Sequence, residues 1–340
     1  GEPAYATTYV FGGKPFANVH YYGKTGGYIK NGPVEYILRP PLKDGEDTAA
    51  VYQGLKYWYG ALGTPVIVPD MDVYLRPEED SAGAGNSLSA GDITRLAECF
   101  QKNTHKNPAQ PFDVMMLLNL PCENQKWYVD RLGILPTNGT DADYPGTVVH
   151  EMFHALGVGR NFSAEFTNDV APIEEANFAS FDKHLYDISG KNIENTDKLV
   201  MVGSKAEAVD PKVFYLLKHN INHGDVESRY AGVYFKGQHV DEVLTLNGQK
   251  ALIAWPDDTE IDPVPGIPMN SIEREDGRYF AEMSHFELQN SLQSHQDYRN
   301  WSIPMEVELA ALEDLGYTID RRKLFGNSIY NSGIEYVNNN

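Results

Sequence analysis

Residues 147–157 read Thr147-Val148-Val149-His150-Glu151-Met152-Phe153-His154-Ala155-Leu156-Gly157. Two histidines four positions apart, with a glutamate directly after the first, form the pattern H-E-x-x-H. On a helix, side chains four residues apart project from the same face. The two imidazoles could therefore hold one Zn²⁺ ion, at nitrogen–zinc distances of about 2.0–2.1 Å.

Glu151 would lie beside such a metal, where a carboxylate can accept a proton from a water molecule. The remaining face of the helix is apolar, with Val148, Val149, Met152, Phe153, Ala155 and Leu156. Burial of that face turns the histidines toward a cleft. The alternative is a chance pair of histidines on an amphipathic helix. Gly157 argues against chance, because a glycine at this place can end the helix with a positive φ and turn the chain toward a third ligand.

The composition is that of a globular protein. The chain has 340 residues, of which 41% are hydrophobic and 22% charged, so it can form one large or two ordinary domains. The net charge of −20 argues against nucleic acid or an anionic membrane surface as a partner. No apolar run reaches the roughly 18 residues that span a bilayer. The first residues lack the pattern of a signal peptide, and we expect that any export signal has been removed.

Local patterns predict the secondary structure. Hydrophobic positions three or four apart predict helices at residues 47–62, 92–102, 178–186, 206–219 and 305–316. Apolar runs predict short strands within 1–48, strands at 66–68 and 71–75, a central strand at 112–120, an edge strand at 127–135 and a strand at 230–244. Asp143 or Tyr144 can cap the helix that carries the histidines, with Pro145 in its first turn.

The pattern His150-Glu151-x-x-His154-x-x-Gly157 resembles the start of the metzincin zinc-peptidase signature, H-E-x-x-H-x-x-G-x-x-H. The chain departs from it at Arg160, which stands where the signature has a third histidine. Leishmanolysin-like metzincins place a long insertion before that histidine. The downstream order of segments here is similar, with Ser284-His285-Phe286-Glu287, Ser302-Ile303-Pro304-Met305 and Leu312-Glu313-Asp314-Leu315-Gly316-Tyr317. The chain is also similar to the metalloprotease domain of some bacterial autotransporter passengers.

This resemblance covers about residues 50–330 and is looser downstream of the H-E-x-x-H pattern. It implies an α/β (α+β) fold in which a mixed, twisted sheet and an active-site helix line a cleft between an upper and a lower lobe. We expect an N-terminal lobe at 1–157, a C-terminal lobe with the insertion, third ligand and Met-turn at 158–320, and a linker or following domain at 321–340.

The third metal ligand is predicted to be His285, with Met305 beneath the metal. His285 has apolar neighbours, and Pro304 before Met305 fits a tight turn that presents a thioether to the site. His295 is the closest rival, although its surroundings are polar. The other histidines after Gly157 are more typical of surface or core positions: His184, His219, His223 and His239. Glu174 is spaced from His154 like the carboxylate ligand of gluzincins, which leaves that family as an alternative.

Together these residues predict a secreted or cell-surface zinc endopeptidase, with Glu151 as general base and a peptide paired to an edge strand. We expect a monomer that belongs to a larger surface protein. A surface adhesin or glycan-binding module on a protease-like fold is a second hypothesis, and a zinc hydrolase of non-peptide substrates is a third.

Two further groups of residues have alternative interpretations. An acidic stretch could bind Ca²⁺, although it lacks the D-x-D-x-D-G loop, so a solvated loop is favoured: Asp70, Asp72, Glu78, Glu79 and Asp80. The two cysteines, Cys99 and Cys122, would form a disulfide in an exported protein and remain thiols in the cytosol. We expect the disulfide.

Overall fold

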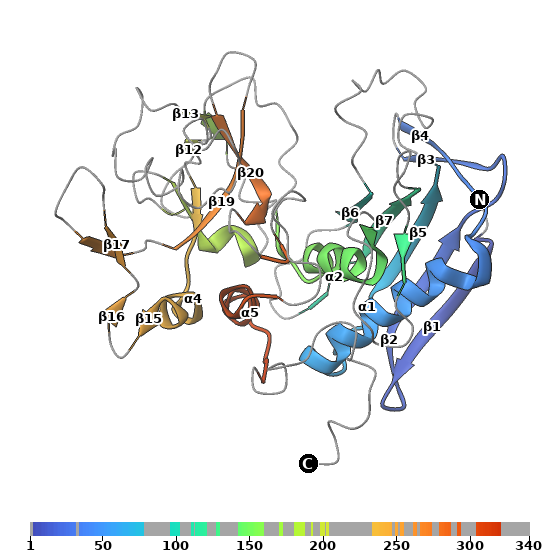
Figure 1. Ribbon diagram of the computed structural model, residues 1–340, viewed down its shortest axis with the longest axis horizontal. Helices are drawn as coiled ribbons and strands as arrows, with labels where there is room; N and C mark the ends of the chain where they lie inside the picture. The colour runs from blue at the N-terminus through green and yellow to red at the C-terminus, as the bar shows by residue number, and fades with distance from the viewer. Residues whose placement is uncertain are drawn as a thin grey trace. The chain divides into compact units, whose positions relative to one another are not determined.

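The computed structural model divides into two compact units (Figure 1). The first takes in Gly1–Asn103 and Gln110–Leu156, and the second takes in Gly157–Ile319. The structure describes residues 3–31, 34–77, 96–102, 110–111, 113–120, 127–129, 142–159, 170–172, 180–187, 192, 198–200, 202–203, 233–246, 249–250, 252–254, 261–263, 266–273, 279–286, 291–293 and 304–320.

A five-stranded mixed sheet forms the centre of the first unit (Figure 1). Its strands, in spatial order, are β1 (Tyr5–Phe11), β2 (Lys14–Tyr22), β5 (Asp70–Arg76), β7 (Val114–Asn119) and β6 (Ala97–Gln101). β1 and β2 form an antiparallel hairpin, and β2, β5 and β7 are parallel to one another. β6 pairs antiparallel with β7 at the end of the sheet.

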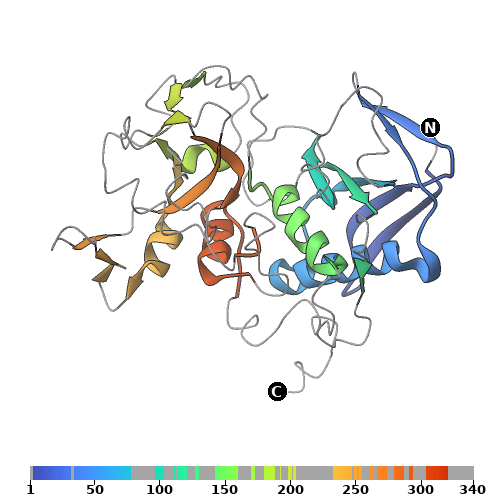
Figure 2. The ribbon, with the colours of Figure 1, turned by 45° about the horizontal axis from the view of Figure 1, so that its top comes forward.

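Two helices cover one face of this sheet, as Figures 1 and 2 both show: α1 (Glu46–Leu62) and α2 (Tyr144–Ala155). Side chains alternate between the faces of a strand, and one set of buried residues on the central strands faces the helices. The helices also contact each other directly. Trp58 Nε1 of α1 donates to the Val149 carbonyl of α2 at 3.1 Å, and the Trp58 ring packs edge-on against Phe153.

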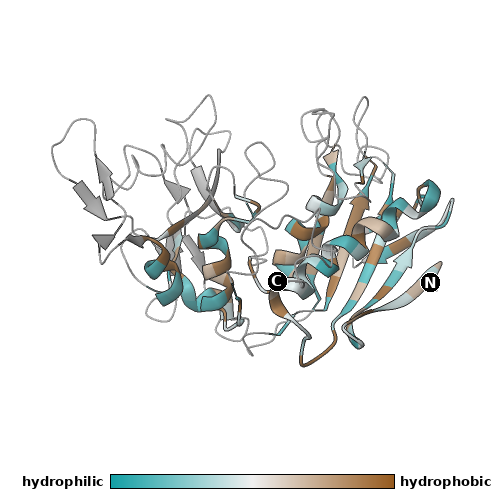
Figure 3. Ribbon diagram, turned by 60° about the horizontal axis from the view of Figure 1, so that its bottom comes forward, coloured by the Kyte–Doolittle hydropathy of each residue, from teal (hydrophilic) through white to brown (hydrophobic). Residues whose placement is uncertain are grey.

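The opposite face carries a second hydrophobic cluster. It consists of Leu38, Tyr74, Met115 and Leu117, with Tyr22, Ile29, Tyr36 and Phe100 packed against it. Two of these residues come from a hairpin that lies outside the main sheet, formed by β3 (Tyr28–Asn31) and β4 (Val34–Ile37). Figure 3 shows that apolar residues dominate the central strands, whereas the outer strands mix apolar and hydrophilic residues. The sheet is therefore buried on both faces at its centre.

A buried ion pair ties the start of α2 to the rest of the first unit. Arg39 Nη2 lies 2.9 Å from Asp47 Oδ1, and both side chains are almost fully buried. The Tyr144 hydroxyl, on the first residue of α2, also donates to Asp47. Arg39 donates in addition to the Arg76 carbonyl of β5 at 2.9 Å. The pair thus links α1, the sheet and the helix that carries the two histidines.

An antiparallel sheet forms the centre of the second unit. Its strands, in spatial order, are β11 (Leu185–Asp187), β14 (Val233–Phe235), β19 (Ile267–Glu273), β20 (Tyr279–Phe286) and β13 (Val202–Gly203). The described residues of this unit include helices α4 (Gln238–Val243) and α5 (Glu306–Asp314). Asp314 at the end of α5 caps α4, because its carboxylate accepts from the backbone N–H groups of His239 and Val240 at 2.7 and 3.0 Å. Phe181, Phe235 and Phe286 pack in its core.

The remaining described elements are short: β8 (Trp127–Tyr128), β9 (Ala142–Asp143), β10 (Val170–Pro172), β12 (Lys198–Val200), β15 (Thr245–Leu246), β16 (Gln249–Lys250), β17 (Leu252–Ala254), β18 (Ile261–Pro263), and 3₁₀ turns at Lys43–Gly45 and Ser180–His184. Within the described ranges, no helix has both the length and the apolar composition needed to cross a membrane.

Several predicted elements are confirmed, and the mixed α/β class with them. The predicted helices at 47–62 and 305–316 correspond to α1 and α5, and the central strand at 112–120 corresponds to β7. The early strands are β1 to β4. The predicted edge strand at 127–135 is described only at its start, as β8, and the predicted helix at 206–219 lies outside the described residues.

Other predictions are wrong in whole or in part. In the segment 92–102, expected to be helical, residues Ala97–Gln101 form strand β6, because pairing with β7 outweighs the local helical spacing. Val66 and Ile67 are exposed loop residues and not strand residues. In 230–244, the described residues 233–244 form strand β14 followed by helix α4, which begins at the Asp314 cap. The prediction of a helix at 178–186 is confirmed in part, because Ser180–His184 form a 3₁₀ helix before strand β11 begins.

Candidate metal centre

Helix α2 begins where the sequence predicts. The Asp143 side chain accepts a hydrogen bond from the Gly146 backbone N–H at 2.7 Å, and Pro145 lies in the first turn. The Thr147 hydroxyl donates to the Asp143 carbonyl at 2.7 Å. These contacts satisfy groups that every helix start leaves unpaired. The cap sets the residue at which the helix begins, and with it the face of the helix on which the two histidines lie.

The end of α2 is also as expected. Gly157 follows the helix with φ 109°, a backbone conformation that side chains disfavour, and the chain leaves the helix there. Edge strand β6 supports this last turn, because Gln101 Nε2 donates to the His154 carbonyl at 2.7 Å. The second histidine is therefore held by its own helix and by the neighbouring strand.

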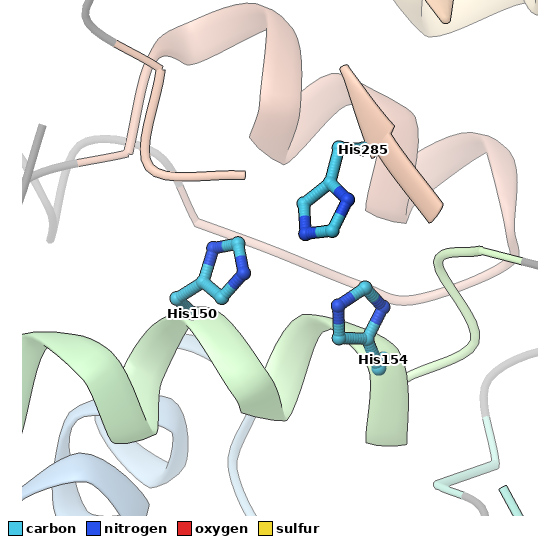
Figure 4. Close-up of side chains that lie close together, drawn as sticks. All are labelled: His150, His154 and His285. Carbon is cyan, nitrogen blue, oxygen red and sulfur yellow. The ribbon is translucent and has the colours of Figure 1, made fainter. Parts of the chain in front are cut away.

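Three histidine side chains come together, as Figure 4 shows. His150 and His154 project from the same side of α2, with ring centroids 5.5 Å apart. His285, on β20, points toward both of them. One nitrogen of each ring lies within 4.8 Å of the other two. In the described part of the chain, this is the one cluster of histidine, cysteine or carboxylate groups that could hold a metal.

Glu151 lies next to this group. Its Oε1 is 3.9 Å from His150 Nε2, and its Oε2 is 4.0 Å from His154 Nε2. The residue is 4% exposed. A buried carboxylate in this place can accept and release a proton. Its oxygens are too far from either imidazole ring for a direct hydrogen bond.

Cys99 on β6 is a free thiol. The expected disulfide with Cys122 is therefore absent, and Cys122 lies outside the described residues. Cys99 pairs with Met116 of β7 and its pKa is raised well above the usual value, first by burial and then by the nearby Glu151 carboxylate. The thiol is thus kept neutral close to the Glu151 carboxylate.

Met305 is the residue that precedes α5. It is half-buried, and its backbone N–H donates to Glu308 Oε2 at 2.7 Å. The sequence interpretation placed the Met305 thioether beneath the metal, and this remains a prediction.

Two of the other histidines, His184 and His239, are described and are not part of the histidine group. His184 stacks on Phe235, and its Nδ1 lies 2.8 Å from the Lys236 carbonyl. His239 lies near Glu242 and Glu313. The other candidates are outside the described residues: His219, His223, His295 and Glu174.

The acidic stretch considered for Ca²⁺ is described only at Asp70 and Asp72. Asp72 makes an ion pair with Lys102 and lies 3.6 Å from His20, while Asp70 accepts from Asn18. Glu78, Glu79 and Asp80 are outside the described residues.

The residues of β6 that lie near the histidine group were not predicted from the sequence. Cys99 and Gln101 both face α2, but the segment that carries them was predicted to be helical. Apolar and polar residues do not alternate along Ala97–Gln101, so the local pattern does not predict this strand, which depends on its pairing with β7.

No known protein family, curated protein or solved structure matches this chain. The geometry of the site is therefore the basis for inferring the function. Three neutral imidazoles are a donor set that Zn²⁺ prefers, with an open fourth position in catalytic sites. Tetrahedral coordination brings ligand nitrogens to about 3.3 Å from one another, which small side-chain movements achieve from the observed grouping. The three histidines fit a zinc ion.

Proposed function

We propose that this protein is a zinc-dependent endopeptidase in which His150, His154 and His285 bind the metal. The observation that carries the proposal is the convergence of three imidazoles next to a buried glutamate. When bound, zinc supplies a Lewis acid that polarises the scissile carbonyl and makes water more acidic. The Glu151 carboxylate takes the proton of the attacking water and delivers it to the leaving amine.

Strand β6 is the proposed docking edge for the peptide. Leu96 and Lys102 direct backbone groups at β7, because the Leu96 carbonyl accepts from Asn119 and the Lys102 N–H donates to Asp113. In an antiparallel pair this direction alternates along the strand. The backbone groups of Ala97, Cys99 and Gln101 therefore point away from β7, where an extended peptide could add as a further strand.

The architecture of the first unit supports a metzincin-like fold as part of this proposal. Its mixed sheet and the helix that carries His150 and His154 agree with the mixed sheet and active-site helix that the resemblance implies. The proposed location, secreted or at the cell surface, depends on the resemblance alone, since the free thiol of Cys99 gives it no support.

Zinc stoichiometry and peptide cleavage test the proposal together. The purified parent should bind one zinc ion per chain and cleave an unstructured protein such as casein. His285→Ala should lose both properties, whereas His295→Ala and Glu174→Ala should keep them. A parent that neither binds zinc nor cleaves peptides would overturn the proposal. Loss of zinc in Glu174→Ala, with His285→Ala unaffected, would favour the gluzincin alternative instead.

A further inference from the structure

A short turn, Ser291 to Gln293, lies against the end of β20, where His285 is found. The Gln293 carbonyl accepts a hydrogen bond from the Phe286 backbone N–H at 3.2 Å. The Gln293 side chain reaches back, and its Nε2 donates to the Ser284 carbonyl at 3.0 Å. Ser284 and Phe286 are the two chain neighbours of His285. One buried residue thus holds the main chain on both sides of this histidine.

The turn is itself held by the Glu308 carboxylate of α5. Glu308 Oε1 accepts from the Gln293 N–H at 2.6 Å and from the Ser291 hydroxyl. Its Oε2 accepts from the N–H groups of Leu292 and Met305 at 3.1 and 2.7 Å. A carboxylate has about four acceptor sites, so four donors fill this one. All the acceptor sites of Glu308 are therefore used in hydrogen bonds to protein groups, and none is left for a metal.

The hydrogen bonds of Gln293 and Glu308 matter because strand β20 by itself holds His285 only loosely. His285 is only half-buried and is the second-last residue of its strand, and strand ends are places where main-chain position is loosely determined. Glu308 is fully buried on a helix with an apolar buried face, including Val307 and Leu309. Hydrogen bonds to a charged acceptor are the stronger kind. Glu308 of α5 thus holds Gln293 in place, and Gln293 in turn holds Ser284 and Phe286, the two chain neighbours of His285.

We propose that Gln293 is a positioning residue that sets the main chain around His285 for metal binding, with Glu308 fixing Gln293. This inference rests on the proposed function, in which His285 is a zinc ligand. Metal sites need their ligands held to within about 0.5 Å. Loss of a group that orients a ligand typically weakens metal binding by about 10- to 100-fold.

The test compares zinc affinity in matched variants, measured by competition with a chromophoric chelator. Gln293→Met keeps the volume of the side chain and removes its donor. The control is Asn192→Leu in the same unit. Asn192 is also a buried amide, and its Nδ2 donates to the carbonyls of Lys183 and Leu185 at 2.7 and 3.0 Å beside β11. Gln293→Met should bind zinc at least about tenfold more weakly than the parent, and Asn192→Leu should bind within twofold of it.

Two further measurements separate positioning from general destabilisation. The metal-free melting temperatures of Gln293→Met and Asn192→Leu should fall similarly, because each loses buried amide hydrogen bonds. The visible absorption spectrum of bound Co²⁺ should change in Gln293→Met and match the parent in Asn192→Leu. If Gln293→Met does not fold, Ser291→Ala, which removes one donor to Glu308, should lower zinc affinity in the same direction by a smaller factor.

The outcomes distinguish this inference from the function on which it rests. A parent without zinc, or His285→Ala with parental zinc affinity, would overturn both. Loss of zinc in His285→Ala combined with parental affinity and an unchanged Co²⁺ spectrum in Gln293→Met would overturn the positioning role alone. Equal loss of affinity in Asn192→Leu would also overturn it, since the effect would then follow from stability.

Discussion

At the scale of single residues, the central feature is a buried carboxylate between two imidazoles. Glu151 is adjacent in sequence to His150 and one helical turn before His154, so its oxygens lie about equally far from both Nε2 atoms, at 3.9 and 4.0 Å. The position of Glu151 is set by helix α2, whereas the metal would be held by the imidazole rings of the three histidines. Base and ligands can therefore be removed separately.

Glu151→Gln should leave zinc binding intact and abolish turnover. Glutamine has nearly the same shape, but it cannot accept the proton of the attacking water. We expect kcat to fall by at least about 10²-fold, with zinc content measured by atomic absorption equal to that of the parent. His150→Ala is the matched comparison, because it should lose the metal as well. Near-parental peptidase activity in Glu151→Gln would contradict the role of this residue as general base.

Cys99 should be a protected thiol. Because Cys99 is free and the chain contains two cysteines, unfolding without a reductant should expose two thiols to a labelling reagent. In the native protein Cys99 should react slowly at neutral pH, since its raised pKa disfavours the reactive thiolate. Peptide mapping identifies the labelled position, and Cys99→Ser serves as the control. Failure of Cys99 to label after unfolding would show that it forms a disulfide.

At the scale of elements, the contact between α1 and α2 determines where the histidine helix lies on the sheet. Gly54 of α1 faces Val148 of α2, two residues before His150. A Cβ atom at Gly54 would lie 2.6 Å from Val148 Cγ1 and 3.0 Å from its Cβ. Real carbon atoms do not approach so closely, so the missing side chain permits this close approach of the helices.

Gly54→Ala and Gly60→Ala should have opposite effects on stability, although both replace a glycine of α1. Gly54→Ala should cost about 1–3 kcal/mol, because the methyl group overpacks the contact with Val148. Gly60 is exposed, and a Cβ there meets nothing within 4 Å. Gly60→Ala should therefore add about 0.5–1 kcal/mol through the higher helix propensity of alanine. Urea denaturation measures both, and destabilisation by Gly60→Ala would contradict this description of α1.

At the scale of the whole molecule, buried tyrosines make stability depend on alkaline pH. The chain has 21 tyrosines. Burial raises the pKa of Tyr9 to about 12 and raises the pKa values of Tyr21 and Tyr144 well above 10.0. In the unfolded chain these phenols ionise near pH 10. Stability from these groups is therefore complete below about pH 10 and is lost as the pH rises through their folded-state values.

Alkaline unfolding should consequently begin above about pH 10. For Tyr9 the loss is on the order of 3 kcal/mol once the pH exceeds 12. Absorbance near 295 nm counts ionised phenols, and circular dichroism follows the fold. Some tyrosines should ionise only as the circular dichroism changes. Tyr9→Phe should shift the alkaline unfolding midpoint upward. Ionisation of every tyrosine near pH 10 in a fully folded protein would contradict this prediction.

The sequence by itself determined the histidine helix and its boundaries. Asp143 and Pro145 at its start and Gly157 at its end act through contacts with immediate chain neighbours, and such contacts can be inferred from spacing. The same holds for α1, α5 and β7, whose apolar patterns are long or continuous. H-E-x-x-H likewise predicted that His150 and His154 lie together, because residues four apart on a helix share a face.

Only the tertiary structure decided the features that depend on distant partners. The segment that forms β6 has no decisive local pattern, and it is a strand because β7 offers it backbone hydrogen bonds. His285 was one of several candidate ligands in the sequence, and only the folded chain brings its ring beside His150 and His154. The hydrogen bonds by which Gln293 and Glu308 hold its backbone could likewise not be predicted from the sequence. Such contacts join residues whose sequence separation carries no periodic signal, so they follow from packing alone.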